Sequence, residues 1–282
     1  MAEVFDNRPC FLGEGPLWHP DRRMLFWFDI IGKRLLARGQ DGTRDWQFDE
    51  HVSAAGLVDA ATLLIASETG LWRFDIDSGT RSLLAPLEAD RPETRSNDGR
   101  ADPWGGFWIG TMGKQAEPGA GAIYRWYRGA LRVIAPGISI SNAICFAPDR
   151  SCAYYADTAR QIMWRQPLDA EGWPEGDRAI WRDFTAEGLW PDGAVTDAAG
   201  GIWLAQWGAG RVARHHADGA FDRALTLPAP HASCPAFASG RLVVTTAQEG
   251  LDPDALRAAP LSGQVFDLGP VAGARDEPRV ML

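Results

Sequence analysis

The chain is built from one short pattern that recurs six times along its 282 residues. Each copy contains a short strand, a turn of the Asp-Pro, Asp-Ala or Ser-Gly kind, a strongly apolar strand, a second turn and a strand of alternating polarity. The copies begin at residues 14, 55, 97, 142, 192 and 234, so their spacings are 41, 42, 45, 50 and 42 residues. Repeats of about 40 to 50 residues with a hydrophobic period of two are typical of four-stranded propeller blades.

The six copies predict an all-β fold, a six-bladed β-propeller whose four-stranded blades surround a central channel. No long amphipathic helix and no linker interrupts the pattern, so residues 1–282 are interpreted as a single domain. The segments AEVF near the start and PRVML at the end lie outside the six copies. We expect one or both of them to complete the last blade and close the ring.

Composition narrows the range of partners and compartments. The formal net charge of −9 argues against a nucleic-acid partner, which would need a basic surface. No segment approaches the roughly 18 apolar residues of a membrane span, and the N-terminus lacks the features of a signal peptide. The four cysteines, Cys10, Cys145, Cys152 and Cys234, have neither a disulfide nor a zinc spacing. We therefore expect free thiols in a cytoplasmic protein that is a monomer or a weak homo-oligomer.

The first residues of the six copies occupy equivalent places, near one mouth of the predicted channel. In order they are Glu14, Ala55, Asn97, Asn142, Asp192 and Cys234. Four of the six carry a side-chain oxygen, and two carboxylates buried together without a cation would repel each other. Carboxylate and amide oxygens without His or Cys suit Ca²⁺, Mg²⁺ or Mn²⁺, and leave Fe²⁺ and Zn²⁺ open. The sequence therefore predicts one divalent metal ion, although each of these residues taken alone is also a common turn former.

Five segments carry a resemblance to a known family. They are LGEGPLWHP, RSNDGRADPWGGFWIGTMG, SISNAICFAPD, WPDGAVTDAAGGIWLAQWGAGRVARHHADG and TTAQEGLDPDALRAAPLSGQVF. In this order they resemble the SMP-30/gluconolactonase/regucalcin family over nearly the whole chain. The resemblance implies a six-bladed propeller that binds one divalent metal in its channel, with Ca²⁺ favoured, and that hydrolyses sugar lactones.

Site residues follow from the resemblance position by position. It implies that Glu14, Asn142 and Asp192 are the metal ligands. It also implies that Arg95 and Asn97 contact the substrate, with Asn97 close to the metal.

Two departures from the family pattern affect the site. Some members place a substrate-binding Glu in the loop after Gly-Thr-Met, where this chain offers Gln115 with Glu117 nearby. The family usually has Asn-Gly where this chain has Asn142-Ala143, so the backbone after that ligand is less free.

The predicted reaction is the opening of an aldonolactone, such as a glucono-, galactono-, xylono- or arabinonolactone, by metal-assisted attack of water on the carbonyl. Asp192 is interpreted as the general base that accepts the proton of this water, with Glu14 as the competing candidate. One alternative is an arylesterase or organophosphate hydrolase on the same metal propeller. Another is a calcium-binding propeller without catalysis. The five histidines share no repeat position, and we expect His215 and His216 to be solvated in a blade turn.

Overall fold

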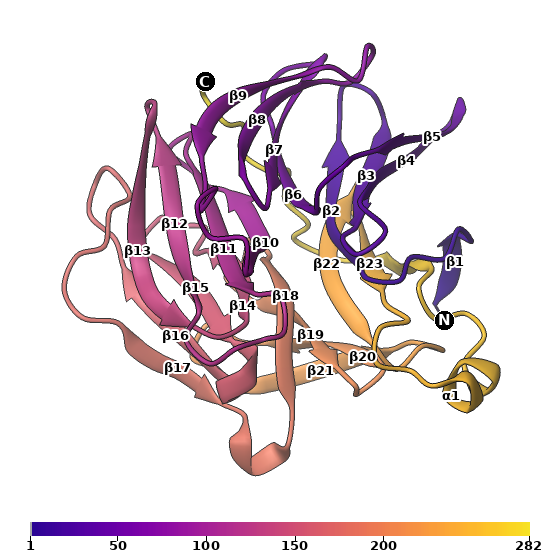
Figure 1. Cartoon of the computed structure of the whole chain (residues 1–282). Helices are drawn as coiled ribbons and strands as arrows, with labels where there is room; N and C mark the ends of the chain where they lie inside the picture. Colours follow the sequence, from indigo (N-terminus) through magenta and orange to yellow (C-terminus); the bar gives the residue numbers. More distant parts are fainter. Residues whose placement is uncertain (1) are drawn as a thin grey trace.

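The computed structural model describes residues 2–282, and its strands form six four-stranded antiparallel sheets around one axis (Figure 1). Blade 1 contains β2 (Gly13–His19), β3 (Met24–Asp29), β4 (Arg34–Gly39) and β5 (Gly42–Gln47). Blade 2 contains β6 (Val52–Leu57), β7 (Thr62–Ser67), β8 (Gly70–Asp75) and β9 (Arg81–Pro86). Blade 3 contains β10 (Thr94–Ala101), β11 (Phe107–Gly113), β12 (Gly121–Tyr127) and β13 (Ala130–Ile138). Blade 4 contains β14 (Ser141–Phe146), β15 (Cys152–Asp157), β16 (Ile162–Pro167) and β17 (Ala179–Asp183). Blade 5 contains β18 (Trp190–Thr196), β19 (Ile202–Trp207), β20 (Arg211–His215) and β21 (Phe221–Thr226). The first strand of each blade is its innermost strand, as predicted.

The sixth blade joins the two ends of the chain. It contains β22 (Ala232–Ala238), β23 (Arg241–Thr246), β24 (Val265–Pro270) and, as its outer strand, β1 (Glu3–Asp6). The N-terminal segment therefore closes the ring, whereas residues 279–282 cross to other blades. There, Val280 N donates to Leu57 O at 2.6 Å and Met281 N donates to Gly105 O at 2.9 Å. The predicted six-bladed propeller is confirmed; Met1, the first residue of the predicted domain, lies outside the described residues.

Helices are short and peripheral. The α-helix α1 (Pro253–Ala258) begins where Asp252 accepts a hydrogen bond from Ala255 N at 2.8 Å, with proline at the first helical position. The 3₁₀ helices are η1 (Thr158–Arg160) and η2 (Thr185–Glu187). Within residues 2–282, none of these helices is long and apolar enough to cross a membrane.

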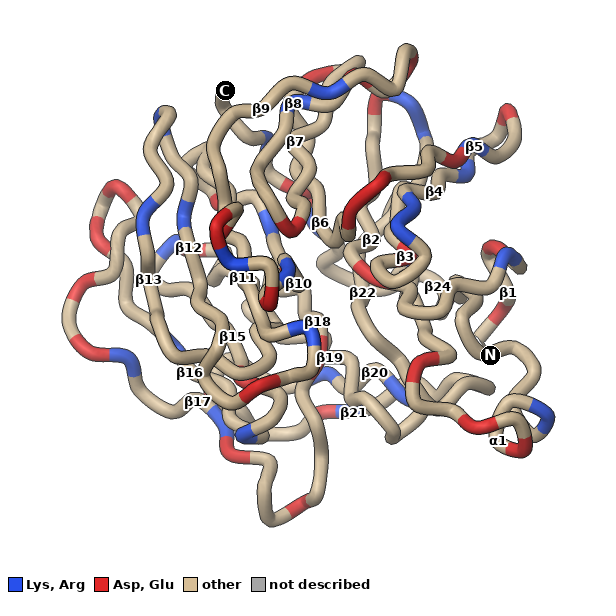
Figure 2. Tube along the Cα trace, in the orientation of Figure 1, with Lys and Arg blue, Asp and Glu red and all other residues tan. Residues whose placement is uncertain are grey.

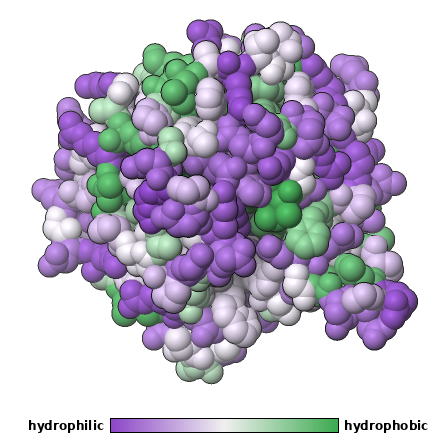
Figure 3. Space-filling model, viewed as in Figure 1, coloured by the Kyte–Doolittle hydropathy of each residue, from purple (hydrophilic) through white to green (hydrophobic). Residues whose placement is uncertain are grey.

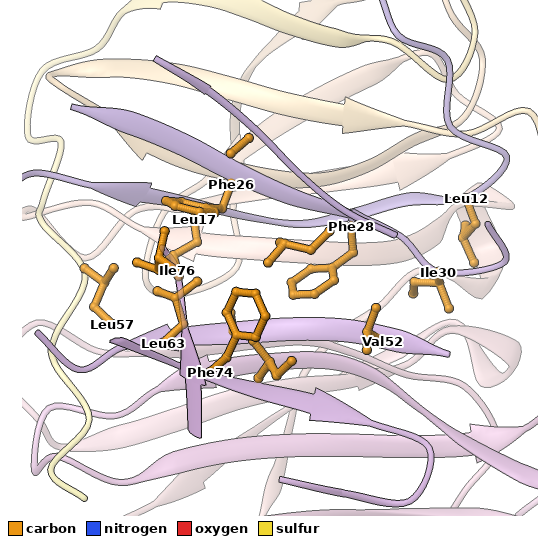
Figure 4. Packing of buried hydrophobic residues seen from close by; sticks show 14 of the residues in the cluster. Leu12, Leu17, Phe26, Phe28, Ile30, Val52, Leu57, Leu63, Phe74 and Ile76 are labelled. Atoms are coloured by element: carbon orange, nitrogen blue, oxygen red, sulfur yellow. The ribbon is translucent and has the colours of Figure 1, made fainter. Parts of the chain in front are cut away.

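The hydrophobic core lies between the blades, in one cluster for each pair of neighbouring sheets. Figure 4 shows Phe26 and Phe28 of β3 facing Leu63 of β7 and Phe74 of β8. Leu64, the next residue along β7, packs instead against blade 3, because alternate side chains of a strand point to opposite faces. Each sheet is covered on both faces, which explains why the second strand of each copy is almost entirely apolar.

His215 contradicts the expectation that it is solvated. It ends β20 with only 1% of its surface exposed, and its ring meets Trp181, Phe184 and Phe221 edge-on, each at a centroid distance of 5.8 Å. Its Nδ1 finds no hydrogen-bond partner among residues 2–282. Burial, reinforced by the nearby positive charges of Arg182 and Arg211, lowers the pKa of His215 to about 4. The sequence did not indicate this burial, because a histidine that packs as an aromatic ring in the core has no characteristic polar residue beside it in the sequence.

We expect His215→Phe to reduce the acid sensitivity of folding. Below about pH 6.5 the unfolded chain protonates this histidine, whereas the folded chain resists protonation until about pH 4. As the pH is lowered from about 6.5 to about 4, the free energy of unfolding of the protein with His215 therefore decreases, by about 3 kcal/mol in total at 1.36 kcal/mol per pKa unit. Urea unfolding at pH 7 and pH 4 should show a drop smaller by about that amount in the variant. An unchanged drop would mean that His215 is protonated in the folded protein.

Candidate active site and metal centre

Each inner strand is irregular at or near the residue that begins its copy of the repeat. The pairing with the second strand shifts between Glu14 and Leu17, Val52 and Ala54, Ser96 and Gly99, Asn142 and Cys145, Pro191 and Ala194, and Ala232 and Pro235. A β-bulge adds a residue on one strand and redirects the side chains beside it. The repeated bulge thus lets polar side chains turn into the channel although the rest of the strand packs between blades.

These side chains line one cavity of about 690 Å³ at a mouth of the channel. Its walls include Glu14, Arg95, Asn97, Asn142 and Asp192, each no more than 6% exposed. Figure 3 shows a largely hydrophilic centre on the face viewed there. The structure therefore brings together five site residues that were predicted from positions almost 180 residues apart in the sequence.

The cavity places two buried carboxyl groups, those of Glu14 and Asp192, on its walls. Elsewhere on the trace acidic and basic residues are interspersed (Figure 2). Burial, together with the charge of Asp98, raises the pKa of Glu14 to about 8. Burial and the charge of Glu14 raise the pKa of Asp192 well above its usual value. The two carboxylates destabilise each other's charged forms in the protein alone, and a cation between them would remove that conflict.

The donor set fits a hard divalent cation. Glu14 and Asp192 supply carboxylate oxygens and Asn142 supplies a carboxamide oxygen, the ligand types that Ca²⁺ takes. Within residues 2–282 there is no cluster of three or more His, Cys, Asp or Glu side chains suited to a metal. The present set differs from such clusters because one of its members is an amide, and the open cavity leaves room for water and substrate beside it.

Hydrogen bonds hold the amides of the site in a chain. Arg95 Nη1 donates to Asn97 Oδ1 at 2.6 Å, and Asn97 Nδ2 donates to Asn142 Oδ1 at 3.0 Å. Asn142 Nδ2 in turn donates to Thr158 Oγ1 at 2.8 Å. The oxygen of Asn142 is therefore turned toward the Asn97 side of the cavity.

The two residues of the loop after β11 are placed differently. Gln115 lines the cavity, whereas the exposed side chain of Glu117 folds back and its Oε2 accepts a hydrogen bond from Gln115 N at 3.1 Å. The ring residues Ala55 and Cys234 lie deeper, where with Asp98 they border a separate small cavity of about 10 Å³. Asp98 accepts from Ile144 N at 2.7 Å, and its Oδ1 has no hydrogen-bond partner in the described chain.

The residue after each of the two cavity carboxylates, Glu14 and Asp192, has to be glycine for steric reasons. A Cβ on Gly15 would lie 2.5 Å from Ser53 O, and one on Gly193 would clash with Cys234 Sγ. Gly15 also has a φ of 52°, in the left-handed region. Ala143 adopts the same conformation with a φ of 56°. The departure from Asn-Gly therefore falls where the backbone favours glycine, and alanine accepts some strain there.

We expect Gly15→Ala to displace Glu14 and to destabilise the fold by roughly 2–4 kcal/mol, from left-handed strain plus overpacking. Gly137→Ala is the matched control, because Gly137 has a φ of 72° and, apart from its two chain neighbours, no atom of residues 2–282 lies within 4 Å of the place that its new methyl group would occupy. It should show the strain alone. Urea unfolding and the Ca²⁺ affinity of both variants check this, and equal losses in the two would exclude a steric role for Ser53 O.

Residues that follow the second strand of a blade also line the cavity, and the sequence interpretation missed them. They are Lys114 after β11, Thr158 after β15 and Glu249, three residues beyond β23. In an antiparallel pair, the end of the second strand lies beside the start of the first, so all reach the same mouth. In the sequence, these residues could have been found by comparing the position that follows the second strand of each copy. The residue types at that position differ from blade to blade, so they do not form an obvious motif.

An aromatic pair forms another wall. Trp207 ends β19 and stacks on His231 with a centroid distance of 4.2 Å and an interplanar angle of 15°. Both line the cavity, together with the exposed Trp190. Flat apolar faces of this kind can cover the C–H face of a sugar ring as well as an aryl group.

Comparisons with known proteins decide the family. The profile described as SMP-30/Gluconolactonase/LRE-like region matches residues 12–248. The chain belongs to this family. One family relative, the L-arabinolactonase of Azospirillum brasilense, is 36% identical over 90% of this chain and 87% of its own length. Another, the 6-deoxy-6-sulfogluconolactonase of Pseudomonas putida, is 34% identical over 92% and 91%.

A solved structure agrees with this assignment. A calcium-binding protein, regucalcin, from Agrobacterium tumefaciens str. C58 superposes with a TM-score of 0.98 at 39% identity, covering 100% of this chain and 98% of that one. Family membership and these relatives identify the chain as a lactonase-type hydrolase.

Proposed function

We propose that the protein opens an aldonolactone to the free sugar acid, with one divalent metal ion, Ca²⁺ by preference, held by Glu14, Asn142 and Asp192. The observation that carries this proposal is the convergence of two buried carboxylates, a fixed carboxamide and Arg95 in one open cavity. When bound, the metal would polarise the lactone carbonyl and increase the acidity of a nearby water. Zn²⁺, Mn²⁺, Mg²⁺ and Fe²⁺ are the other ions to test.

The residues of the chain have separate tasks in this reaction. Asp192 accepts a proton from the water whose oxygen attacks the carbonyl carbon. The ring C–O bond then breaks, and the proton passes to the ring oxygen, which becomes the hydroxyl of the product. Arg95, oriented by its bond to Asn97, binds substrate oxygens with the remaining N–H groups of its guanidinium. Gln115 lies at the rim to bind a sugar hydroxyl, and Glu117 holds the backbone of that loop.

The test is hydrolysis of a panel of sugar lactones, followed by acid release in a weakly buffered indicator solution. We expect turnover that stops with chelator and returns on adding one of the divalent ions. Metal-independent turnover, or none on any lactone, would overturn the proposal.

The Trp207–His231 wall makes an aryl ester the second candidate substrate. Phenyl acetate and an aryl organophosphate therefore belong in the same panel, and a preference for them would replace the sugar. Tight Ca²⁺ binding without turnover of any substrate would support a calcium-binding propeller instead. The four buried free thiols are consistent with the cytoplasm as the site of this reaction.

A further inference from the structure

Thr158 links the strand of one proposed metal ligand to that of another. It follows β15 as the first residue of η1 and is 8% exposed at the wall of the cavity. Its hydroxyl accepts a hydrogen bond from Asn142 Nδ2 at 2.8 Å. The same hydroxyl donates to Pro191 O at 2.6 Å, on the residue before Asp192. One side chain thus contacts β14 and β18, the inner strands of blades 4 and 5.

The direction of these bonds follows from the number of protons available. A threonine hydroxyl has a single proton, and a backbone carbonyl can only accept. The proton is therefore committed to Pro191 O, and Thr158 offers Asn142 nothing but a lone pair. Only the NH₂ end of the Asn142 amide can face a lone pair, so the Oδ1 end must face the other way.

An independent contact on the opposite side gives the same orientation. Asn97 donates through Nδ2 to Asn142 Oδ1 at 3.0 Å, while its own Oδ1 accepts from Arg95 Nη1 at 2.6 Å. Asn97 Nδ2 also donates to Ser141 O at 2.9 Å, which excludes a flip of its amide. Both neighbours of Asn142 thus require its oxygen, and not its nitrogen, on the side of Asn97.

We propose that Thr158 is a positioning residue that fixes the amide of Asn142 so that its oxygen is available to a cation. This inference rests on the proposed function, because it assumes that Asn142 is a ligand. Without the hydroxyl, Asn97 alone would hold the oxygen of Asn142 in place. Rotation of the amide by about 180° would then be easier, and it would present NH₂, which has no lone pair for a metal. The bond to Pro191 O also couples this amide to the backbone that carries Asp192, so that the two ligands keep their relative placement.

The test removes the hydroxyl and keeps the shape. Thr158→Val should weaken the binding of Ca²⁺, titrated alone into chelator-stripped protein by calorimetry, by about 10–100-fold, the usual effect of losing a hydrogen bond behind a ligand. Thr158→Ser keeps the hydroxyl and should bind within about threefold of the unchanged protein, on the same principle. Thr158→Ala is a second hydroxyl-free variant, with the same expected loss, if the valine variant does not fold.

Thr196→Val is the matched structural control. Thr196 is also buried, and its hydroxyl donates to Phe146 O at 2.6 Å, which joins the far ends of the same two inner strands. It should lose stability without losing Ca²⁺ affinity. Unchanged affinity in Thr158→Val, or an equal loss in Thr196→Val, would overturn the positioning role. If the protein without any substitution binds none of Ca²⁺, Mn²⁺ and Zn²⁺, the proposed metal site itself is wrong.

Discussion

Asp192→Asn is expected to abolish lactone hydrolysis and, in the absence of metal, to make the protein more stable. The substitution keeps an oxygen that can bind a cation but removes the group that accepts a proton, so kcat/KM should fall by at least about 100-fold. It also removes one of two buried carboxyl groups whose charged forms disfavour each other, since Glu14 and Asp192 are each only 4% exposed. The gain in free energy of unfolding should be on the order of 1 kcal/mol, as expected when a functional residue is held at the expense of stability.

Glu14→Gln is the matched comparison for this prediction. It removes the other carboxyl group of the same pair and should raise the stability of the metal-free protein in the same way. Initial rates at saturating metal, with urea unfolding in chelator, separate the two roles. If Asp192 is the base, its variant loses much more activity than Glu14→Gln; the reverse order would make Glu14 the base. Retained activity in Asp192→Asn would remove Asp192 from the mechanism.

The fold and most of the cavity could be predicted because the chain repeats itself. When six similar sheets close into a ring, residues at the same position of the repeat lie at the same height around the channel. The position of Glu14 in the first copy therefore pointed to Asn142 and Asp192 in later copies. The alternation of β7 between two interfaces, with Leu63 on one side and Leu64 on the other, explains why the apolar strand marked each copy so clearly.

The parts that broke the repeat could not be predicted in the same way. Ala55 and Cys234 hold the same repeat position as the proposed ligands but line a different, smaller cavity, and the bulges of β6 and β22 lie at slightly different places along their strands. Thr158 and Glu249 reach the cavity from a second position that shares no residue type. The conformation of Glu117 depends on a bond to its own loop, which the sequence does not show.

A stabilising contact beneath the site was also hidden from the sequence. Arg100 of β10 donates from Nε to Ile144 O and from Nη2 to Ala194 O, both at 3.0 Å. These carbonyls lie two residues after Asn142 and Asp192, so a single guanidinium ties three inner strands together. Its Nη1 pairs with Glu277 of the C-terminal segment, and both side chains are less than 10% exposed.

Arg100→Met is therefore expected to lower the free energy of unfolding by about 3–5 kcal/mol, the usual effect of leaving one partner of a buried ion pair alone. The cause is an unpaired Glu277 carboxylate together with two carbonyls that lose their donors. Urea unfolding in chelator measures the loss without a contribution from metal binding. A loss below about 1 kcal/mol would show that the pair is solvated and that the three strands hold together without it.

The double variant Arg100→Met with Glu277→Leu distinguishes the charge from the strand contacts. Replacing a buried ion pair by apolar side chains of similar size is often close to neutral, so the part of the loss due to the lone carboxylate should be recovered. The part that persists belongs to the carbonyls of Ile144 and Ala194. Because those carbonyls lie next to the proposed ligands, the persistent part should be accompanied by weaker Ca²⁺ binding, whereas the recovered part should not.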